Sequence, residues 1–273
     1  IRRPPRSTLF PYAPLFRSVD AQKCKRDGLC AAVCPAGCIA IDAEGLPYEA
    51  DGAACIACGH CAAVCPGDCL ANSLLPEEPM PPVSRELPGV EALAGLVLAR
   101  RSVREFKDAP VDPAQLAGLL DVARRAPTAV NTQHVHWIAC CDPARTRALA
   151  AACADWLRAS ASHGRYAARW DQGEDVILRG APAFVLAYAP TDYTWGAVDC
   201  SIALTTLELL AVADGLGTCW AGLVTRAMSL DPAIARGLGL PEGHMVHGGL
   251  MLGHPRYRYR AVPPRKPLNA IWL

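Results

Sequence analysis

The chain has 273 residues and a formal net charge of +1, with 52% apolar and 19% charged residues. This length and apolar content suffice for one small and one medium domain, each with a buried core. A charge so close to neutral disfavours broad attraction to nucleic acid or to a membrane surface, and no run of about 18 apolar residues predicts a transmembrane helix. We therefore expect neither a nucleic-acid nor a membrane partner.

Residues 1–18 show neither helical nor strand periodicity and carry several prolines. We expect them to be a non-native or disordered segment outside the fold. A genuine arginine-rich targeting arm is the alternative, but no apolar stretch of the kind found in signal peptides follows Arg2 and Arg3.

Nine of the 14 cysteines lie between Cys24 and Cys69. A disulfide framework needs an oxidising compartment, and we see no secretory signal peptide. The clustered cysteines therefore indicate reduced thiolates that bind metal in a cytoplasmic protein. The remaining cysteines have apolar or small neighbours and are expected to be small buried core residues: Cys140, Cys141, Cys153, Cys200 and Cys219.

A cysteine pattern occurs twice, which indicates an internal repeat. The sequence CKRDGLCAAVCPAGCI begins at Cys24, and CIACGHCAAVCPGDCL begins 31 residues later at Cys55. The second copy matches the C-x2-C-x2-C-x3-C-P run of bacterial ferredoxins, in which three thiolates hold one cubane and the fourth is directed into the other cluster. The pattern predicts a two-cluster domain over residues 19–74. A structural zinc site, which also takes four thiolates, is the alternative.

By this crossed arrangement, one [4Fe-4S] cluster is expected to have four thiolate ligands: Cys34, Cys55, Cys58 and Cys61. At the other cluster, three thiolates and one carboxylate occupy the ligand positions: Cys24, Cys30, Cys65 and Asp27. Asp27 stands where the repeat requires a cysteine, as in the aspartate-containing ferredoxins that this pattern resembles. Three outcomes stay open: Asp27 binds the fourth iron, that iron is absent and leaves a [3Fe-4S] cluster, or the site is degenerate. We favour an occupied cluster with a labile fourth iron, and expect Cys38 and Cys69 to pack near the clusters.

Five prolines between Leu75 and Pro88 predict an extended linker over residues 75–88, because proline resists helix interiors. The following domain, residues 89–273, mixes helical and strand patterns, so the fold class is α+β. Helices are expected over 90–101, 113–125, 144–162 and 197–214, with Asp112 as an N-cap and Gly215 as a terminator. Short buried strands are expected over 136–141, 183–188 and 244–252.

Four segments of this domain resemble the FMN-dependent nitroreductase family in their order along the chain. They are RRSVREF, APTAVNTQ, GLGTCWAG, and GHP followed by PRKP. A dinucleotide fingerprint at Gly215 and Gly217 is rejected because the third glycine is missing at the required spacing. The resemblance implies a small ferredoxin-like two-cluster domain followed by an FMN-dependent nitroreductase-type α/β sandwich. A flavin phosphate is a dianion, and guanidinium forks suit it.

The resemblance also implies which residues hold FMN. The first and last segments are expected to hold the phosphate and ribityl chain, the second to offer amide groups, and the third to bring backbone N–H groups close to N5. The expected cofactor-binding residues are Arg100, Arg101, Ser102, Arg104, Pro127, Thr128, Asn131, Gln133, Ala221, Gly222 and Arg265. No catalytic residue is expected, because the flavin performs the chemistry. The aromatic residues Tyr193, Trp195 and Trp220 are candidates either for the substrate pocket or for the core.

These observations predict an oxidoreductase that uses FMN and two iron–sulfur clusters. Reduced FMN passes electrons to a small organic acceptor of the nitroaromatic, quinone or activated-alkene class, and the donor is a ferredoxin or flavodoxin, or NAD(P)H. An electron-transfer or storage module that serves a partner protein is the alternative. The resemblance implies a homodimer with the flavin at the subunit interface.

Overall fold

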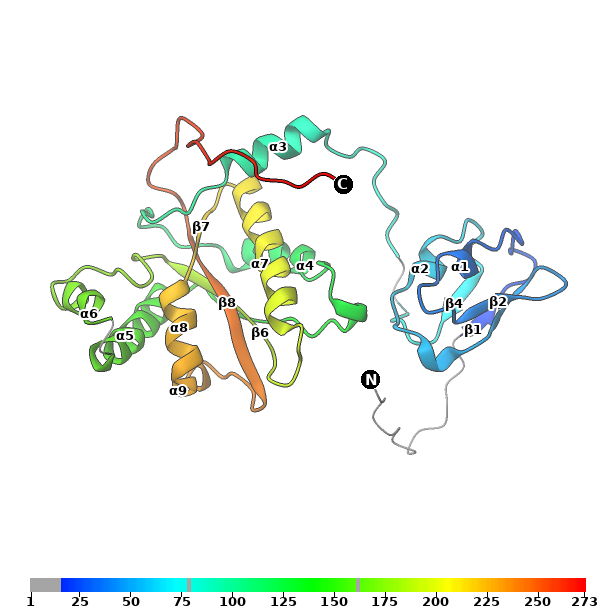
Figure 1. The fold of residues 1–273 in the computed structure, drawn as a ribbon, viewed down its shortest axis with the longest axis horizontal. Helices are drawn as coiled ribbons and strands as arrows, with labels where there is room; N and C mark the ends of the chain where they lie inside the picture. The colour runs from blue at the N-terminus through cyan, green and yellow to red at the C-terminus, as the bar shows by residue number, and fades with distance from the viewer. Residues whose placement is uncertain (1–15, 78–79, 161–162) are drawn as a thin grey trace. The chain divides into compact units, whose positions relative to one another are not determined.

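The computed structural model describes residues 16–77, 80–160 and 163–273 (Figure 1). The backbone divides into two compact units, residues 1–85 and residues 86–273. Between the last strand of the first unit and the first helix of the second, residues 75–77 and 80–88 form neither helix nor strand. This agrees with the proline content, since proline lacks the backbone donor that regular structure requires.

The first unit consists of two short helices and two small antiparallel sheets, and its halves follow the sequence repeat. Each helix starts at a left-handed glycine, Gly28 or Gly59. The helices contact each other, and each also contacts the strand that follows its own repeat copy (Figure 1). Strand β1 pairs with β4, and β2 pairs with β3. The elements are β1 Phe16–Val19, α1 Leu29–Ala32, β2 Ile39–Ile41, β3 Pro47–Glu49, a 3-10 turn Gly52–Ala54, α2 His60–Ala63 and β4 Leu70–Asn72.

Residues 16–18 belong to this unit, so the prediction that the whole segment 1–18 lies outside the fold is wrong for them. In the β1–β4 ladder, Phe16 lies opposite Asn72 and Val19 opposite Leu70. The N–H of Asp20 continues the contact by donating to the carbonyl of Cys69 at 2.9 Å. Antiparallel pairing satisfies backbone groups through a partner strand at the far end of the domain, which local periodicity does not reveal. Residues 1–15 lie outside the described residues.

The second unit is built on a four-stranded antiparallel sheet with the strand order β5-β6-β8-β7. Long β8 pairs with β6 along most of its length and with β7 at its end. The elements are α3 Val90–Ala99, α4 Pro113–Ala123, a 3-10 turn Ala129–Asn131, β5 His136–Cys140, α5 Pro143–Ala159, α6 Gly164–Asp171, β6 Ala183–Pro190, α7 Gly196–Ala213, β7 Gly217–Trp220, α8 Gly222–Leu230, α9 Pro232–Arg236 and β8 His244–Gly253.

Helices cover both faces of this sheet and form an α/β sandwich. Successive side chains of β6 point to opposite faces, as the strand period of two requires. Phe184 and Leu186 pack into the core beneath α5, α6, α8 and α9, whereas Val185 and Ala187 pack into the core beneath α4 and α7. In Figure 1, α7 lies across the sheet. Among the described residues, α7 alone has the length and apolar composition to span a membrane, and here it contacts α4, β6 and β8.

Most expected elements of the second unit are confirmed, with small shifts at their ends. The Asp112 carboxylate accepts from the N–H of Ala114 and caps α4 as predicted. Helix α5 ends at Ala159, earlier than expected, because Ser160 adopts an extended conformation; residues 161–162 lie outside the described residues. Strand β5 is only partly buried because it is an edge strand. Helices α6, α8 and α9 and strand β7 were not expected.

The isolated cysteines only partly follow the prediction of buried core residues. Three are buried: Cys153, Cys200 and Cys219. Cys140 and Cys141 are only partly buried, since they lie at the end of the edge strand β5.

Candidate functional site

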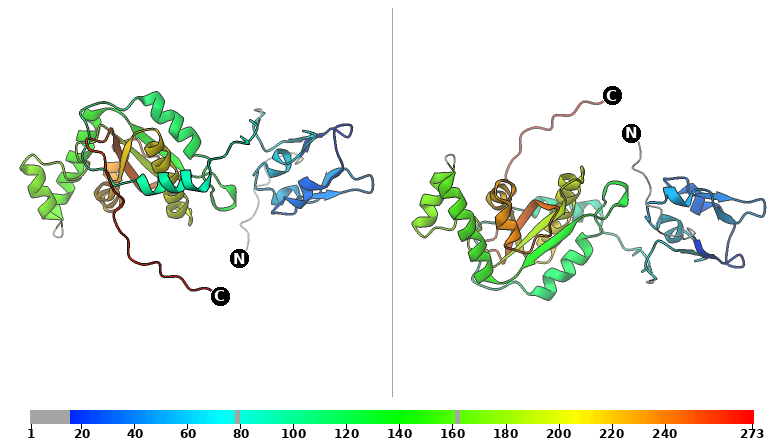
Figure 2. Two further views of the ribbon diagram at one scale, coloured as in Figure 1. Left: turned by 90° about the horizontal axis from the view of Figure 1, so that it is seen from above. Right: turned by 90° about the horizontal axis from the view of Figure 1, so that it is seen from below.

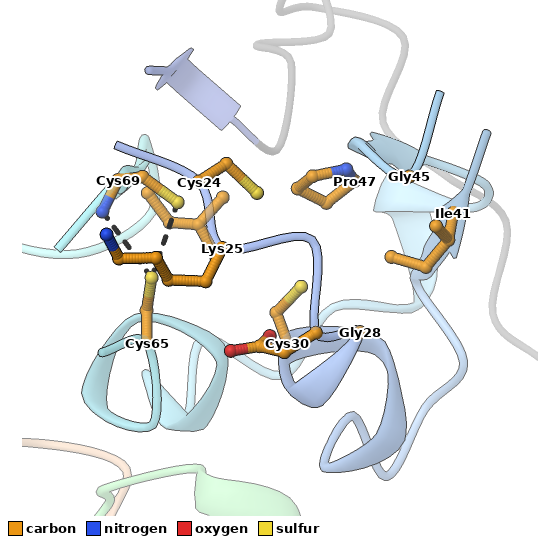
Figure 3. A pocket seen from close by; sticks show the side chains of 11 residues that line it. Cys24, Lys25, Gly28, Cys30, Ile41, Gly45, Pro47, Cys65 and Cys69 are labelled. Atoms are coloured by element: carbon orange, nitrogen blue, oxygen red, sulfur yellow. Dashed lines mark hydrogen bonds between the residues drawn. The ribbon is translucent and has the colours of Figure 1, made fainter. Parts of the chain in front are cut away.

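The first unit contains a cavity of about 300 Å³, open solvent included, bordered by the ligand set expected for the first cluster (Figure 3). Cys24, Asp27 and Cys30 of the first repeat line it, and Cys65 reaches it from the second repeat. Figure 3 shows these cysteine sulfurs, together with that of Cys69, around a common space. Cys65 of the second repeat thus lies at the cavity bordered by the first repeat, where the predicted crossed arrangement needs it.

A second cavity of about 330 Å³, open solvent included, repeats this arrangement with the halves exchanged. Its lining includes Cys55, Cys58 and Cys61 from the second repeat and Cys34 from the first. Among the described residues, no three His, Cys, Asp or Glu side chains converge closely enough to hold a single metal ion. Four thiolates around a common space can hold either an iron–sulfur cluster or the alternative zinc ion.

The tight loops of the two repeats aim backbone N–H groups at the cysteine sulfurs. Arg26 and Ala57 hold left-handed backbone angles, and their N–H groups donate to the sulfurs of Cys24 and Cys55, each at 3.4 Å. Asn72 adds a longer side-chain contact of 3.9 Å to Cys61. Such N–H donors stabilise thiolate charge, as cluster ligation requires.

Cys34 and Cys65, the two cysteines expected to cross between the repeats, differ from their neighbours in thiol pKa. Burial acts to raise the pKa of Cys34, but N–H donors from Cys38, Ala36 and Gly37 outweigh it and hold that pKa below its usual value. The same balance lowers the pKa of Cys65, where the largest opposing donor is the N–H of Cys69. A lowered pKa favours the thiolate, which is the metal-binding form.

The pKa of Cys38 and of Cys69 is shifted in the opposite direction. Burial, together with contact with the thiol of Cys34 or Cys65, raises the pKa of each to about 12. The Sγ of Cys69 lies 3.3 Å from the Sγ of Cys65. Both residues border the cavities as neutral thiols, which fits the expectation that they pack near the clusters. The Asp27 carboxylate accepts from the N–H of Leu29 at 3.1 Å while it lines the first cavity.

In the second unit, the segment 100–104 lies beside β7. Ser102 forms a bridge with Thr218, and the N–H of Val103 donates to the Thr218 carbonyl at 2.8 Å. Strand β7 leads directly to Ala221 and Gly222 at the start of α8. The fold therefore brings together two segments that the sequence analysis assigned to the flavin.

The arginines of this segment differ in their partners. Arg100 pairs with Glu208 of α7 at 3.3 Å, and the buried Glu208 also accepts from the hydroxyl of Thr218 at 3.2 Å. Arg101 donates to backbone carbonyls through its terminal nitrogens, but its buried Nε has no hydrogen-bond partner. Arg104 is exposed and donates to the Ser102 carbonyl. A buried guanidinium nitrogen without an acceptor fits an anion-binding site that a phosphate completes.

The expected contribution of Arg265 is not assembled within one chain. Arg265 is exposed in a segment without helix or strand that follows β8. Figure 2 shows this C-terminal segment running away from the body of the second unit. Its first residues are tied to the motif 100–106: Arg101 donates to the carbonyl of Ala261 at 3.3 Å, and the N–H of Arg256 donates to the carbonyl of Glu105 at 2.9 Å.

The loop from Thr128 to Gln133 carries three non-glycine residues in the left-handed region: Val130, Asn131 and Gln133, with φ of 45°, 54° and 52°. The N–H of Gln133 donates to the hydroxyl of Thr128 at 3.0 Å and closes the loop. Pro127 directly precedes this loop. Left-handed conformations are costly for such residues and cluster at functional sites.

Two acidic residues that were not expected from the sequence, Asp199 and Glu208, organise this region. Both are buried on α7, where Asp199 contacts the loop and Glu208 contacts Arg100. The available signal was a carboxylate in an otherwise apolar helix, because buried acids need specific partners. Tyr193 donates to Asp199, and burial is the largest cause that raises the Tyr193 pKa. Trp195 and Trp220 are 53% and 38% exposed, so neither is a core aromatic.

Comparison with known proteins matches this division of the chain. Residues 97–254 match the nitroreductase family, and residues 17–66 match a 4Fe-4S dicluster domain. The first match covers more than half of the chain, so this protein belongs to the nitroreductase family. The expected oxidoreductase class and the α+β fold are thereby confirmed.

Individual relatives agree with the family assignment. The chain is 29% identical over 175 residues to an FMN reductase (NAD(P)H) of Bacillus subtilis (strain 168), over 63% of this chain and 68% of that protein. A nitroreductase with bound FMN from Desulfitobacterium hafniense DCB-2 has a TM-score of 0.56 at 22% identity, covering 66% of this chain and 97% of that one. A nitroreductase with bound FMN from Bacteroides fragilis NCTC 9343 gives 0.53 at 22% identity, covering 65% and 95%. At this identity, the structural matches show the fold alone.

Proposed function

We propose that this protein is an FMN- and iron–sulfur-dependent oxidoreductase that reduces an organic acceptor of the nitroaromatic, quinone or activated-alkene class. Its electrons come through the ferredoxin domain or from NAD(P)H. The observation that carries the proposal is the pairing, in one chain, of two thiol-lined cavities with a nitroreductase domain. Fusion raises the effective concentration of the electron donor beside the acceptor domain.

The cavities fit two cubane clusters held in the crossed manner. Cys34, Cys55, Cys58 and Cys61 hold one cluster, and Cys24, Cys30 and Cys65 hold the other together with Asp27. The N–H groups of the repeat loops stabilise the charge on the ligand sulfurs. Asp27 supplies an oxygen ligand, which makes the fourth iron of its cluster labile and allows a [3Fe-4S] form.

The second unit fits FMN through the segments described above. The buried Nε of Arg101 lacks an acceptor that a phosphate oxygen supplies, and Ser102 and Arg104 lie on the same segment. The expected contribution of the second segment comes from Pro127, Thr128, Asn131 and Gln133. Of these, Asn131 and Gln133 offer side-chain amide groups to the cofactor. Ala221 is the N-cap of α8 and Gly222 its first residue, so the N–H of Gly222 lies at a helix N-terminus, which favours negative charge. The N–H of Ala221 already donates to the carbonyl of Gly249 at 2.8 Å. When bound, FMN supplies hydride or electron transfer to the acceptor.

Rapid-mixing reduction of the flavin under anaerobic conditions tests the proposed donor. We expect a low-potential one-electron donor of the ferredoxin or flavodoxin class to reduce FMN in the intact protein faster than NADH does. A Cys55→Ser/Cys58→Ser variant, which loses one cluster, should slow the one-electron route and leave the NADH route unchanged. Faster turnover with NADH than with every low-potential donor contradicts the relay.

An electron-transfer or storage role is the second candidate, and the doubled cluster motif favours it. The two candidates differ in their behaviour with small acceptors. Reduced holoprotein should turn over nitroaromatics, quinones or activated alkenes if it is the enzyme we propose. Bound FMN and reducible clusters without turnover on such a panel identify a carrier that serves a partner protein.

We further propose a cytoplasmic homodimer that shares the flavin site. The C-terminal segment exposes large apolar side chains, including Leu268, Ile271 and Trp272. Exposed apolar surface of this kind is typical of interaction sites, and the same segment carries Arg265. Light scattering should give twice the 29.0 kDa chain mass, and truncation after Val262 should give a monomer with weakened FMN binding.

A further inference from the structure

The loop Thr128–Gln133 is strained, and the structure shows what holds it. Val130 is β-branched and lies at φ 45°, where such residues are outliers. Asn131 and Gln133 share the left-handed region within the same short turn. A conformation of this kind persists only when the surrounding structure over-determines it.

Two hydrogen-bonded contacts fasten the loop to the start of α7. The carboxylate of Asp199 accepts from the N–H of Ala129 at 3.1 Å and from the hydroxyl of Tyr193 at 2.5 Å. Because Tyr193 donates to Asp199, its oxygen accepts from the hydroxyl of Thr132, 2.7 Å away. The chain Thr132–Tyr193–Asp199–Ala129 therefore ties both ends of the strained turn to one buried carboxylate. The ring of His134 contacts the Tyr193 ring edge-on, with centroids 5.0 Å apart.

The surroundings of Asp199 indicate that its carboxylate is held by hydrogen bonds with the loop and with Tyr193, and not by an ion pair. Its side chain is buried, with 3% of the residue exposed. Within the part of the chain that the structure describes, no basic side chain lies within ion-pair distance of it. Donors from the loop and from Tyr193, together with the positive end of α7, stabilise its charge. Without the donors from Ala129 and Tyr193, Asp199 would be a buried carboxylate that lacks hydrogen bonds. Asp199, Tyr193 and the loop therefore depend on one another.

We propose that Asp199 and Tyr193 are positioning residues that preorganise the loop Thr128–Gln133 for the flavin, with Thr132 as their contact on the loop. This inference rests on the proposed FMN site, to which Asn131 and Gln133 of the same loop contribute. A loop held in its strained form pays its ordering cost on folding and not on binding, which strengthens affinity. Neither positioning residue needs to touch the cofactor.

FMN affinity of the apoprotein, measured by quenching of flavin fluorescence, tests the inference. We expect Thr132→Ala, which loses one partly buried hydrogen bond, to raise the FMN Kd about tenfold, and Tyr193→Phe, which loses two, to raise it at least as much. Thr132→Ser keeps the hydroxyl and should stay within about twofold of wild type. The double variant should bind FMN no more than about threefold more weakly than Tyr193→Phe alone, because Tyr193→Phe already removes the hydrogen bond that Thr132→Ala breaks. Tyr166→Phe on α6 is the matched control and should leave the Kd unchanged.

The outcomes separate the inference from the proposed function. Wild-type protein that binds no FMN refutes the flavin site itself. Wild-type binding with an unchanged Kd in Tyr193→Phe and Thr132→Ala, even if the thermal midpoint falls, refutes the positioning role alone. Effects that multiply in the double variant also refute it, because they would make the two hydroxyls independent. Tyr193→Phe keeps the inference testable if Thr132→Ala fails to fold.

Discussion

Replacing Gly217 with alanine tests how the arginine segment is held against the sheet. A Cβ at this position would lie 2.8 Å from Val103 Cγ2 and 2.9 Å from Pro255 Cγ. Carbon contacts are optimal at about 3.5–4.0 Å, so the neighbours must retreat by roughly 0.6 Å or more. Val103 is hydrogen-bonded to Thr218 and lies two residues after Arg101, so its displacement also disturbs the arginine segment. Overpacking of this kind costs about 1–3 kcal/mol.

Urea unfolding of the apoprotein, followed by circular dichroism, measures this cost. We expect the free energy of unfolding to fall by about 1–3 kcal/mol with the denaturant slope unchanged, and FMN affinity to weaken in parallel. Gly118→Ala is the matched control, since a Cβ there meets nothing within 4 Å and alanine favours the helix by up to about 1 kcal/mol. If Gly217→Ala is as stable as Gly118→Ala, the close approach inferred here is wrong.

Four further predictions address the cofactors. Cys34→Ser should abolish the electron paramagnetic resonance (EPR) signal of the cluster held by the second repeat, although Cys34 belongs to the first; loss of the other signal would contradict the crossed assignment. Asp27→Cys should give a full four-iron complement at the first cluster and no three-iron signal from the oxidised protein, whereas a three-iron signal that persists would place residue 27 outside the ligand set. Arg101→Ala should weaken FMN binding by about 1.5–3 kcal/mol, which raises the Kd tenfold or more. Binding as tight as in wild type would contradict the proposed contact between the Arg101 Nε and the phosphate. Cys69→Ala should make the reduction potential of the first cluster more negative. The Cys69 thiol lies 3.3 Å from the sulfur of Cys65, and a hydrogen-bond donor to a ligand sulfur stabilises the reduced form of the cluster. A reduction potential equal to that of wild type would show that this contact is without effect.

The cluster domain was largely predictable because cluster ligation depends on the local spacing of the cysteines. Tight loops fix which cysteines can face a common space, and the offset of the repeat fixes which cysteine crosses over. The cavity linings contain the same two sets, including Asp27 in the first. Pairing of Phe16–Val19 with β4 was missed, because a strand at the edge of a sheet draws its partner from a distant segment.

The flavin region was predictable in its segments but not in its connections. Motifs at 100–106 and 126–133 indicated the family, and the fold places the first beside β7. Nothing in the local sequence shows that Asp199 and Glu208, nine positions apart on α7, reach these two segments. Such contacts depend on how the helix packs across the sheet, which periodicity alone does not define.

Cofactor content per chain, measured on anaerobically purified protein together with low-temperature EPR, tests the central claim most directly. The proposed function predicts one FMN and about seven or eight iron atoms with matching sulfide, and the EPR spectrum reports whether the Asp27 site holds a fourth iron. About four irons with FMN would mean that the first site is degenerate. Iron and sulfide without any flavin would contradict the proposed FMN-dependent oxidoreductase and leave the electron carrier as the function of this chain.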